Sequence, residues 1–223
     1  MSYILNIETA TKNCSVALAK DGKTVLCKEL SEQGYSHAEL LHVFIEEILN
    51  ESKITFQDLN AIAISKGPGS YTGLRIGVSS AKGLCYALGI PLIAIDTLTI
   101  LANQIAVEKG LIIPMIDARR MEVYSAVFNS DAEKIREVQA EILTEDSFTS
   151  YNETLHFIGD SSEKAKSVLT NSNFFFHDEI VFPSAKEMSI LSYKKYQNQA
   201  FEDVAYFEPY YLKDFFITSK KTI

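Results

Sequence analysis

The amino-acid sequence predicts an α/β protein of two lobes, each built from a mixed sheet flanked by helices. The 223 residues are more than one compact core usually needs, and they suit two small lobes. With 47% hydrophobic and 22% charged residues, the chain can bury a core in each lobe. The order β-β-β-α-β-α recurs in both halves. We therefore expect an N-terminal lobe at 1–100 and a C-terminal lobe at 101–223.

The first half opens with an antiparallel meander of three strands. Short apolar segments rich in β-branched residues predict strands at 3–7, 14–19 and 24–30. Between the second and third strands, Asp21-Gly22 is typical of a two-residue hairpin turn.

An amphipathic helix follows the meander. Ser36 can cap its start, and Glu39, three residues on, completes a capping box. A second helix is expected to end at Gly89, because glycine is common just after the last residue of a helix. The elements expected next are a strand at 61–65, a helix at 72–88 that ends at Gly89, and a strand at 92–95.

The second half repeats this order. Its expected elements are a helix at 99–108, strands at 111–116, 122–128 and 135–143, a short helix at 145–151, a strand at 155–158, a helix at 161–169, a strand at 173–177 and a helix at 185–198. Antiparallel strands that continue into crossover helices give a mixed sheet. Two such lobes side by side resemble the actin, Hsp70 and sugar-kinase (ASKHA) architecture.

Charge and cysteine content narrow the function classes. The formal net charge of −8 disfavours unaided binding to a phosphate backbone, so we expect any contact with nucleic acid to go through another subunit. The three cysteines are odd in number and lack metal-ligand spacing, which indicates small residues of a reduced core. The first residues do not form the basic region and apolar run that are typical of a signal peptide. No apolar run reaches the roughly 20 residues that a membrane-spanning helix needs. We therefore expect a cytoplasmic protein without membrane contact.

Two turns are candidates for holding phosphate groups. One turn follows the first expected strand. Its hydroxyls and backbone N–H groups can hold anionic oxygens, and its carboxylate can hold a metal through water. The second is rich in glycine and leads into a helix N-terminus, which favours anions. The residues of the first of these turns are also explained by a tight turn whose hydroxyls bond to their own backbone, and those of the second by an ordinary helix cap. We expect no required cofactor and only weak ATP or ADP binding, with these candidate residues: Glu8, Thr9, Thr11, Gly67, Gly69 and Ser70.

The histidines do not predict a metal site. His37 and His42 are five residues apart, about 140° around a helix, whereas ligand pairs on one face need a spacing of three or four. Position 41, where a second ligand would fit, is Leu41. His156 and His177 have no companions at ligand spacing. No nucleophile, base and orienting group can be picked out either, so nucleophilic catalysis gains no support.

Small residues mark the helix after the glycine-rich turn, among them Gly73, Gly77, Ser80 and Gly83. Each glycine inside a helix costs about 0.5–1 kcal/mol relative to alanine, so something must pack closely against this helix. That neighbour is either its own sheet or a partner helix. Because the preceding helix has a wide apolar face, the two helices suggest an interface, although core burial explains the pattern equally well.

Several segments resemble the TsaB (YeaZ) family. The segments are 4–11 (ILNIETAT), 14–18 (CSVAL), 37–41 (HAELL), 67–77 (GPGSYTGLRIG), 117–120 with 122–124 (DARR, EVY), and Pro209 with 211–213. The glycine-rich segment is the most specific, and the strong match covers roughly the first 125 residues. Tyr71 stands where phenylalanine is common, and Lys213 where arginine is usual.

The resemblance implies a non-catalytic subunit of the machinery that forms threonylcarbamoyladenosine (t6A) in tRNA, next to the anticodon. The family is similar to TsaD, the catalytic member, which binds a metal through two histidines four apart. In this sequence Leu41 stands where TsaD has the second of these histidines. The implied partners are TsaD, bound through the first-lobe helices, the ATPase TsaE, a second copy when alone, and tRNA only through the complex. The residues expected at the partner interface are His37, Leu40, Leu41, Phe44, Tyr71, Thr72, Gly73, Arg75, Ile76, Gly77 and Ser80.

Three rival functions remain open. An active ATPase or small-molecule kinase of the same architecture would use the two candidate phosphate turns. A metallopeptidase is disfavoured by the missing ligand pair. A homodimeric binding module unconnected with tRNA is separated from the first interpretation only by identifying its partner.

Overall fold

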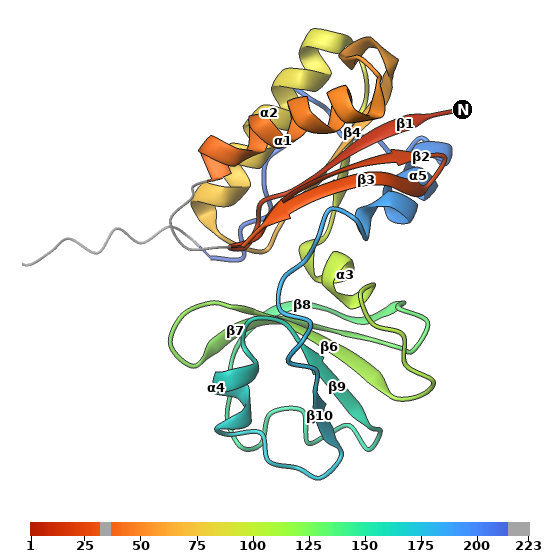
Figure 1. Ribbon diagram of the computed structural model, residues 1–223. Helices are drawn as coiled ribbons and strands as arrows, with labels where there is room; N and C mark the ends of the chain where they lie inside the picture. Colours follow the sequence, from red (N-terminus) through yellow and green to blue (C-terminus); the bar gives the residue numbers. More distant parts are fainter. Residues whose placement is uncertain (32–36, 214–223) are drawn as a thin grey trace, which may run out of the picture.

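Two five-stranded sheets with the same topology form the core of the computed structural model, which describes residues 1–31 and 37–213 (Figure 1). The strand order is β3-β2-β1-β4-β5 in the first sheet and β10-β9-β6-β7-β8 in the second. Each sheet therefore has an antiparallel meander at one edge and parallel strands at the other. Helices flank both sheets, which confirms the predicted α/β class with two mixed sheets.

The elements of the first sheet follow the prediction closely. The Asp21-Gly22 hairpin forms, with φ of +47° and +80° at its two residues, and Gly89 ends a helix at φ +67°. The bounds are β1 Tyr3–Glu8, β2 Cys14–Lys20, β3 Lys23–Leu30, α1 His37–Ser52, η1 Phe56–Asp58, β4 Leu59–Ser65, α2 Tyr71–Leu88, β5 Leu92–Ile95 and α3 Thr97–Ala102. The expected cap of α1, Ser36, lies outside the described residues.

The second sheet begins directly after α3. Its elements are β6 Leu111–Asp117, β7 Glu122–Phe128, β8 Lys134–Ile142, β9 Leu155–Ile158, α4 Ser162–Lys166, β10 Phe174–Phe176 and α5 Met188–Gln197. Strand β6 pairs antiparallel with β7 and parallel with β9, as β1 does with β2 and β4. The repeat predicted from element order is thus present in the sheet topology.

Several helices differ from their predicted bounds. The helix expected at 99–108 starts earlier, because the Asp96 carboxylate accepts hydrogen bonds from the N–H groups of Leu98 and Thr99. It ends at Ala102 and is shorter than expected. The helix expected at 145–151 is a series of turns. Phe148 there adopts a φ of +63°, which an α-helix does not allow, and its buried ring packs edge-on against Phe157. The helices expected at 161–169 and 185–198 shorten to α4 and α5.

The C-terminal helix α5 packs on the first sheet, so the prediction that all of 101–223 forms the second lobe is wrong for this part. Helices α1 and α2 cover one face of the first sheet, and α5 lies on the other (Figure 1). Met188 and Ala185 join Ile4 and Ile93 in one buried cluster. A sheet with two apolar faces must cover both, and the returning C-terminal segment supplies the second cover. Within the part of the chain that the structure describes, no helix is long and apolar enough to cross a membrane.

Candidate functional site

The turn between β1 and β2, the first candidate phosphate turn, is buried. Glu8, Thr9 and Thr11 are each at most 6% exposed. Glu8 Oε1 accepts a hydrogen bond from the Ala10 N–H, while Oε2 has no hydrogen-bond partner among the described residues. Burial raises the pKa of the Glu8 carboxyl from 4.5 to about 7, with the Ala10 N–H acting in the opposite direction. A carboxyl in this position is neutral over part of the physiological pH range.

The second candidate turn packs directly against the first. The Ser70 N–H donates to the Ala10 carbonyl at 2.6 Å, and the Thr9 hydroxyl donates to the Gly73 carbonyl at 2.8 Å. The Ser70 hydroxyl accepts from the Gly73 N–H at 3.3 Å, as a helix cap does. The two turns thus use several of their polar groups on each other, and Ser70 has the ordinary capping role.

Three glycines make this approach possible. A Cβ added at Gly69 would lie 2.3 Å from the Ala10 carbonyl oxygen, and one at Gly73 would lie 2.1 Å from the Thr9 carbonyl oxygen. At Gly77 it would lie 2.2 Å from the Thr9 hydroxyl. The small residues at these positions therefore serve packing inside the chain.

The C-terminal segment covers the start of the glycine-rich turn. The Tyr210 N–H donates to the Lys66 carbonyl at 2.7 Å, and a Cβ on Gly67 would lie 2.6 Å from the Tyr210 carbonyl oxygen. Gly67 has a φ of +112°, which favours glycine, and its N–H donates to the Thr97 hydroxyl at 3.1 Å. Sequence reasoning missed this cover, because no local signal links residues more than 140 positions apart.

The residues expected at a partner interface separate into three groups. Leu41, Gly73 and Gly77 are buried, so their predicted place on the surface is wrong. Thr72 and Arg75 are exposed on α2. The half-buried residues are His37, Leu40, Phe44, Tyr71, Ile76 and Ser80.

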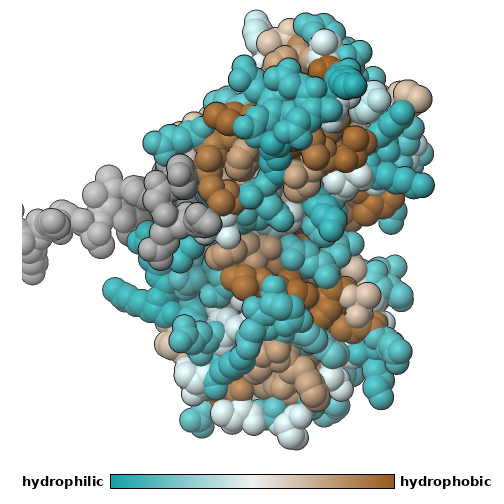
Figure 2. Space-filling model, in the orientation of Figure 1, coloured by the Kyte–Doolittle hydropathy of each residue, from teal (hydrophilic) through white to brown (hydrophobic). Residues whose placement is uncertain are grey.

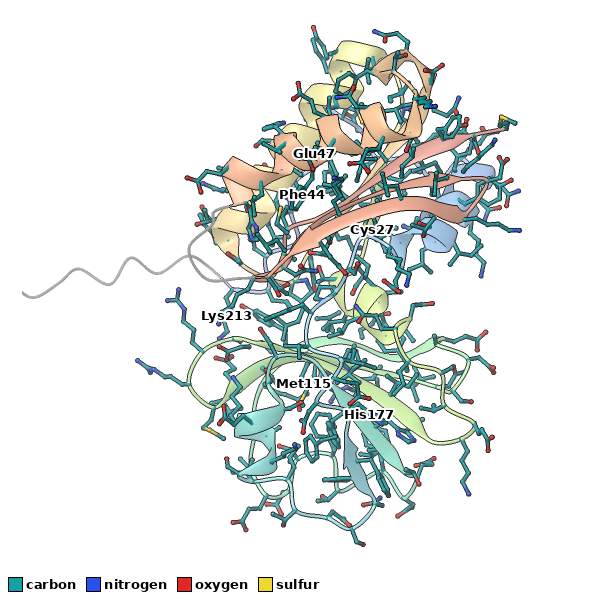
Figure 3. The ribbon with its side chains drawn as sticks, viewed as in Figure 1. Cys27, Phe44, Glu47, Met115, His177 and Lys213 are labelled. Atoms are coloured by element: carbon teal, nitrogen blue, oxygen red, sulfur yellow. The ribbon has the colours of Figure 1, made fainter. Side chains whose placement is uncertain are left out.

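Helix α1 places part of this set away from α2. Leu40 and Phe44 share a helix flank with Glu47 and Glu51, at spacings of three and four. Both glutamates form ion pairs with Lys28 of β3 at 2.7 Å, so this flank faces β3; Figure 3 labels Phe44 and Glu47 there. These apolar residues therefore do not form one surface with α2.

Both histidines of α1 have neighbours within the chain. His37 Nε2 lies 2.7 Å from the Thr11 carbonyl oxygen, which can only accept, so that nitrogen donates. His42 Nε2 lies 3.4 Å from the Ser80 hydroxyl and links α1 to α2. Leu41 between them is fully buried. Among the described residues, no group of three or more histidine, cysteine, aspartate or glutamate side chains is placed to hold a metal.

The outer side of α2 carries a contiguous surface, which we call the α2 surface and define by Thr72, Ile76, Ser79, Ser80, Gly83 and Ala87. Gly83 differs from the other glycines of α2, because a Cβ added there would have no atom of the described residues within 4 Å. Figure 2 shows hydrophobic side chains reaching the surface of the upper lobe between hydrophilic ones. The described part of the chain therefore gives no steric reason for a glycine at position 83.

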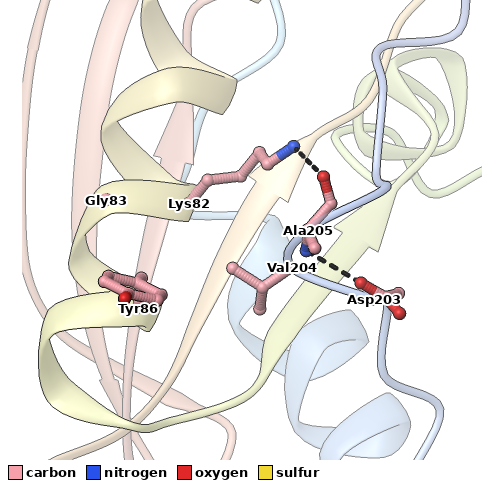
Figure 4. A pocket seen from close by; sticks show the side chains of 6 residues that line it. All are labelled: Lys82, Gly83, Tyr86, Asp203, Val204 and Ala205. Atoms are coloured by element: carbon pink, nitrogen blue, oxygen red, sulfur yellow. Dashed lines mark hydrogen bonds between the residues drawn. The ribbon is translucent and has the colours of Figure 1, made fainter.

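A shallow depression of about 450 Å³ borders the α2 surface (Figure 4). It lies between Lys82, Gly83 and Tyr86 of α2 and residues 203–205 of the C-terminal segment. The Lys82 ammonium donates to the Ala205 carbonyl at 3.2 Å and to that of Phe207 at 2.8 Å, which holds this segment against α2. The ring of Tyr86 is exposed at the rim. This arrangement suits a contact surface better than a reaction site.

Comparison with known proteins identifies related sequences. The profile of the TsaD family, described as tRNA N6-adenosine threonylcarbamoyltransferase, matches residues 29–218. The chain is 38% identical over 130 residues to the tRNA threonylcarbamoyladenosine biosynthesis protein TsaB of Escherichia coli (strain K12), covering 57% of this chain and 55% of that protein. It is 32% identical over 193 residues to TsaB of Buchnera aphidicola subsp. Schizaphis graminum, covering 83% of this chain and 90% of that protein. The matched region spans only about half the length of the Escherichia coli and Bacillus subtilis relatives.

Solved structures show the same fold. A Pseudomonas aeruginosa protein described as uncharacterized, with similarity to peptidase YEAZ, superposes with a TM-score of 0.81 at 25% identity, over 96% of this chain and 100% of that one. The ethanolamine utilization protein EutJ of Carboxydothermus hydrogenoformans superposes with a TM-score of 0.52 at 10% identity, over 85% of this chain and 90% of that one. The second likeness concerns the fold alone.

Proposed function

The chain belongs to the TsaB branch of the TsaD family, and from this premise we propose that it takes part in forming threonylcarbamoyladenosine in tRNA. Its role is that of a non-catalytic subunit in the cytoplasm. It binds TsaD, the catalytic member, and the ATPase TsaE joins the pair. It contacts tRNA only through the complex, in keeping with its net charge of −8.

The observation that carries this proposal is the internal pairing of the two candidate phosphate turns. A phosphate-binding turn needs free N–H groups and hydroxyls directed at the ligand. Here the Ser70 N–H donates to the Ala10 carbonyl, and the Thr9 hydroxyl donates to the Gly73 carbonyl in the first turn of α2. The Ala10 N–H donates to Glu8. Leu41 is a core residue where the family resemblance places a metal-binding histidine. These contacts favour a protein that acts through its surface over an active ATPase or kinase.

The α2 surface is the proposed contact with TsaD. A glycine inside a helix costs about 0.5–1 kcal/mol relative to alanine, and no residue of 1–31 or 37–213 requires a glycine at position 83. Close approach of a partner helix is a reason for a small residue at such a position. Alone, the chain is expected to pair with a second copy through the same surface.

The proposed mechanism is a shift of populations. A subunit can favour one conformation of its partner only by as much as it binds that conformation more tightly. We expect the α2 surface to make more contacts with the transfer-competent conformation of TsaD than with its other states. No bond is made or broken by residues of this chain.

The test measures threonylcarbamoyl transfer to tRNA by the matching TsaD and TsaE. We expect transfer to need this chain, while the chain alone neither transfers the group nor turns over ATP. Gly83→Arg places a long charged side chain on the α2 surface, and we expect it to lower transfer at least about tenfold, a loss of 1.4 kcal/mol or more. Because arginine is a better helix former than glycine, this variant should unfold at the same temperature as the original chain or higher.

One control variant and three outcomes separate the proposed contact surface from the proposed function. Ile142→Arg adds the same charge at an exposed position on β8 of the second lobe, and it should leave transfer unchanged. Full transfer and full TsaD binding by Gly83→Arg would reject the α2 surface as the contact. Full transfer without this chain would reject the proposed function, and ATP turnover by the isolated chain would favour the kinase alternative.

A further inference from the structure

The second lobe brings His156 and His177 together at the edge of its sheet. Strands β9 and β10 pair in parallel with Phe175 opposite His156, so the residue after β10 lies beside the same strand. The His177 N–H donates to the Phe157 carbonyl at 2.9 Å, which fixes its backbone. As a result, His156 Nδ1 lies 3.0 Å from His177 Nε2; Figure 3 labels His177 in this lobe.

The other two ring nitrogens are held by oxygen atoms. His156 Nε2 lies 3.2 Å from the Lys109 carbonyl oxygen, and because a carbonyl only accepts, this nitrogen carries the proton. In the neutral ring His156 Nδ1 then has a lone pair, which accepts the hydrogen bond from His177 Nε2. His177 Nε2 therefore carries the proton of the hydrogen bond between the rings. A cation bound between the two facing nitrogens would replace this proton, which would then move to His177 Nδ1, 3.5 Å from Glu179 Oε1. Metal-binding histidines usually have this arrangement, with the second nitrogen directed at a carbonyl or carboxylate.

The distance between the two facing nitrogens suits a shared ligand. Two imidazole nitrogens bound to one tetrahedral cation at about 2.0–2.1 Å lie about 3.3 Å apart, a few tenths of an ångström more than observed. The side chain of His177 is 27% exposed, so water can reach the remaining coordination positions. Burial lowers the pKa of His156.

From this geometry we propose that His156 and His177 form a binding site for one divalent transition-metal cation of the zinc and copper class, with water as the other ligands. Imidazole nitrogens select these cations over calcium and magnesium, which prefer oxygen. The site lies in the second lobe, on β9 and directly after β10, and does not depend on the α2 surface or on the proposed function.

Zinc titration of the purified, tag-free chain tests the proposal. Calorimetry should show one equivalent of Zn²⁺ bound, Cu²⁺ bound more tightly and Mg²⁺ not bound. The chain has four histidines, so ring ¹H–¹⁵N spectra can follow each one. The signals of His156 and His177 should shift together at one equivalent, while those of His37 and His42 stay in place.

Variants identify the ligands. His156→Asn and His177→Asn should each weaken zinc binding by at least about tenfold, and Glu179→Gln, at a position with a 71% exposed side chain, should weaken it by about tenfold through His177. His42→Asn is the matched control and should bind as the original chain does. Absence of saturable zinc binding, or binding retained by the His156→Asn and His177→Asn double variant, would show that the two rings form only a hydrogen-bonded pair. The exposed Glu179 keeps the test decisive even where a histidine variant folds poorly.

Discussion

At the scale of single residues, Glu8 links protonation to stability. Its pKa is raised from 4.5 to about 7 by burial, so the folded chain binds this proton more tightly than the unfolded chain does. The resulting contribution to the free energy of unfolding is fully present below pH 4.5 and is lost as the pH rises through about 7. Glu8→Gln should remove this dependence, so that between pH 5 and 8 the original chain loses about 2–3 kcal/mol more than the variant. Urea unfolding at both pH values measures the difference.

Parallel stability curves for Glu8→Gln and the original chain would show that Glu8 ionises with an ordinary pKa in the folded state. The glutamine can still accept the hydrogen bond from the Ala10 N–H. The variant therefore tests the effect of the ionisable group and not the loss of this hydrogen bond. The sequence pattern singled out Glu8 as a candidate phosphate or metal residue, and did not indicate that its carboxyl is buried. Its burial depends on α2 packing over the turn, which no local pattern reveals. The same limit applies to His156 and His177, which strand pairing joins across 21 positions.

At the scale of elements, α2 contains glycines with opposite roles. Gly77→Ala would place a methyl group 2.2 Å from the Thr9 hydroxyl and 2.9 Å from Ile64 Cδ1. The Thr9 side chain must then move and lose its hydrogen bond to the Gly73 carbonyl. We expect this variant to lose about 1–3 kcal/mol of unfolding free energy. Gly83→Ala, on the same helix with open space, should gain about 0.5–1 kcal/mol. Urea unfolding of both variants compares them, and the same sign for both would contradict the assigned packing.

Elements set by local signals were predicted well. The strands β5, β7 and β9 begin and end at the predicted residues, and α2 ends at the predicted glycine. The helix expected at 145–151 is lost through a distant contact, whereas the shifted start of α3 follows from the local Asp96 cap. Residues 145–151 contain a helix-compatible pattern, but burial of Phe148 against Phe157 favours a positive φ and breaks the helix. The small-residue pattern of α2 was likewise recognised, and only the three-dimensional structure separates Gly77, which faces the core, from Gly83, which faces solvent.

At the scale of the whole molecule, the chain leaves the first sheet after β5, passes through α3, which packs on β6 and β7, forms the second sheet and returns through α5. The first lobe is therefore closed by a segment that follows the second lobe in sequence. Met188 carries much of this closure, because it is fully buried in a cluster with Ile4 and Ile93 of the first sheet. The stability of the first sheet should consequently depend on residues near the C-terminal end of the described chain.

Met188→Ala tests this dependence. Removing a fully buried methionine side chain should cost about 2–5 kcal/mol. Because the lost contacts lie on the first sheet, amide hydrogen exchange should accelerate in β1, β4 and β5 more than in β6 and β7. Phe157→Leu, in the core of the second sheet, is the matched control and should give the reverse pattern. Equal acceleration in both sheets for both variants would mean that the lobes open as one cooperative unit, and then α5 would stabilise the whole molecule and not the first lobe alone.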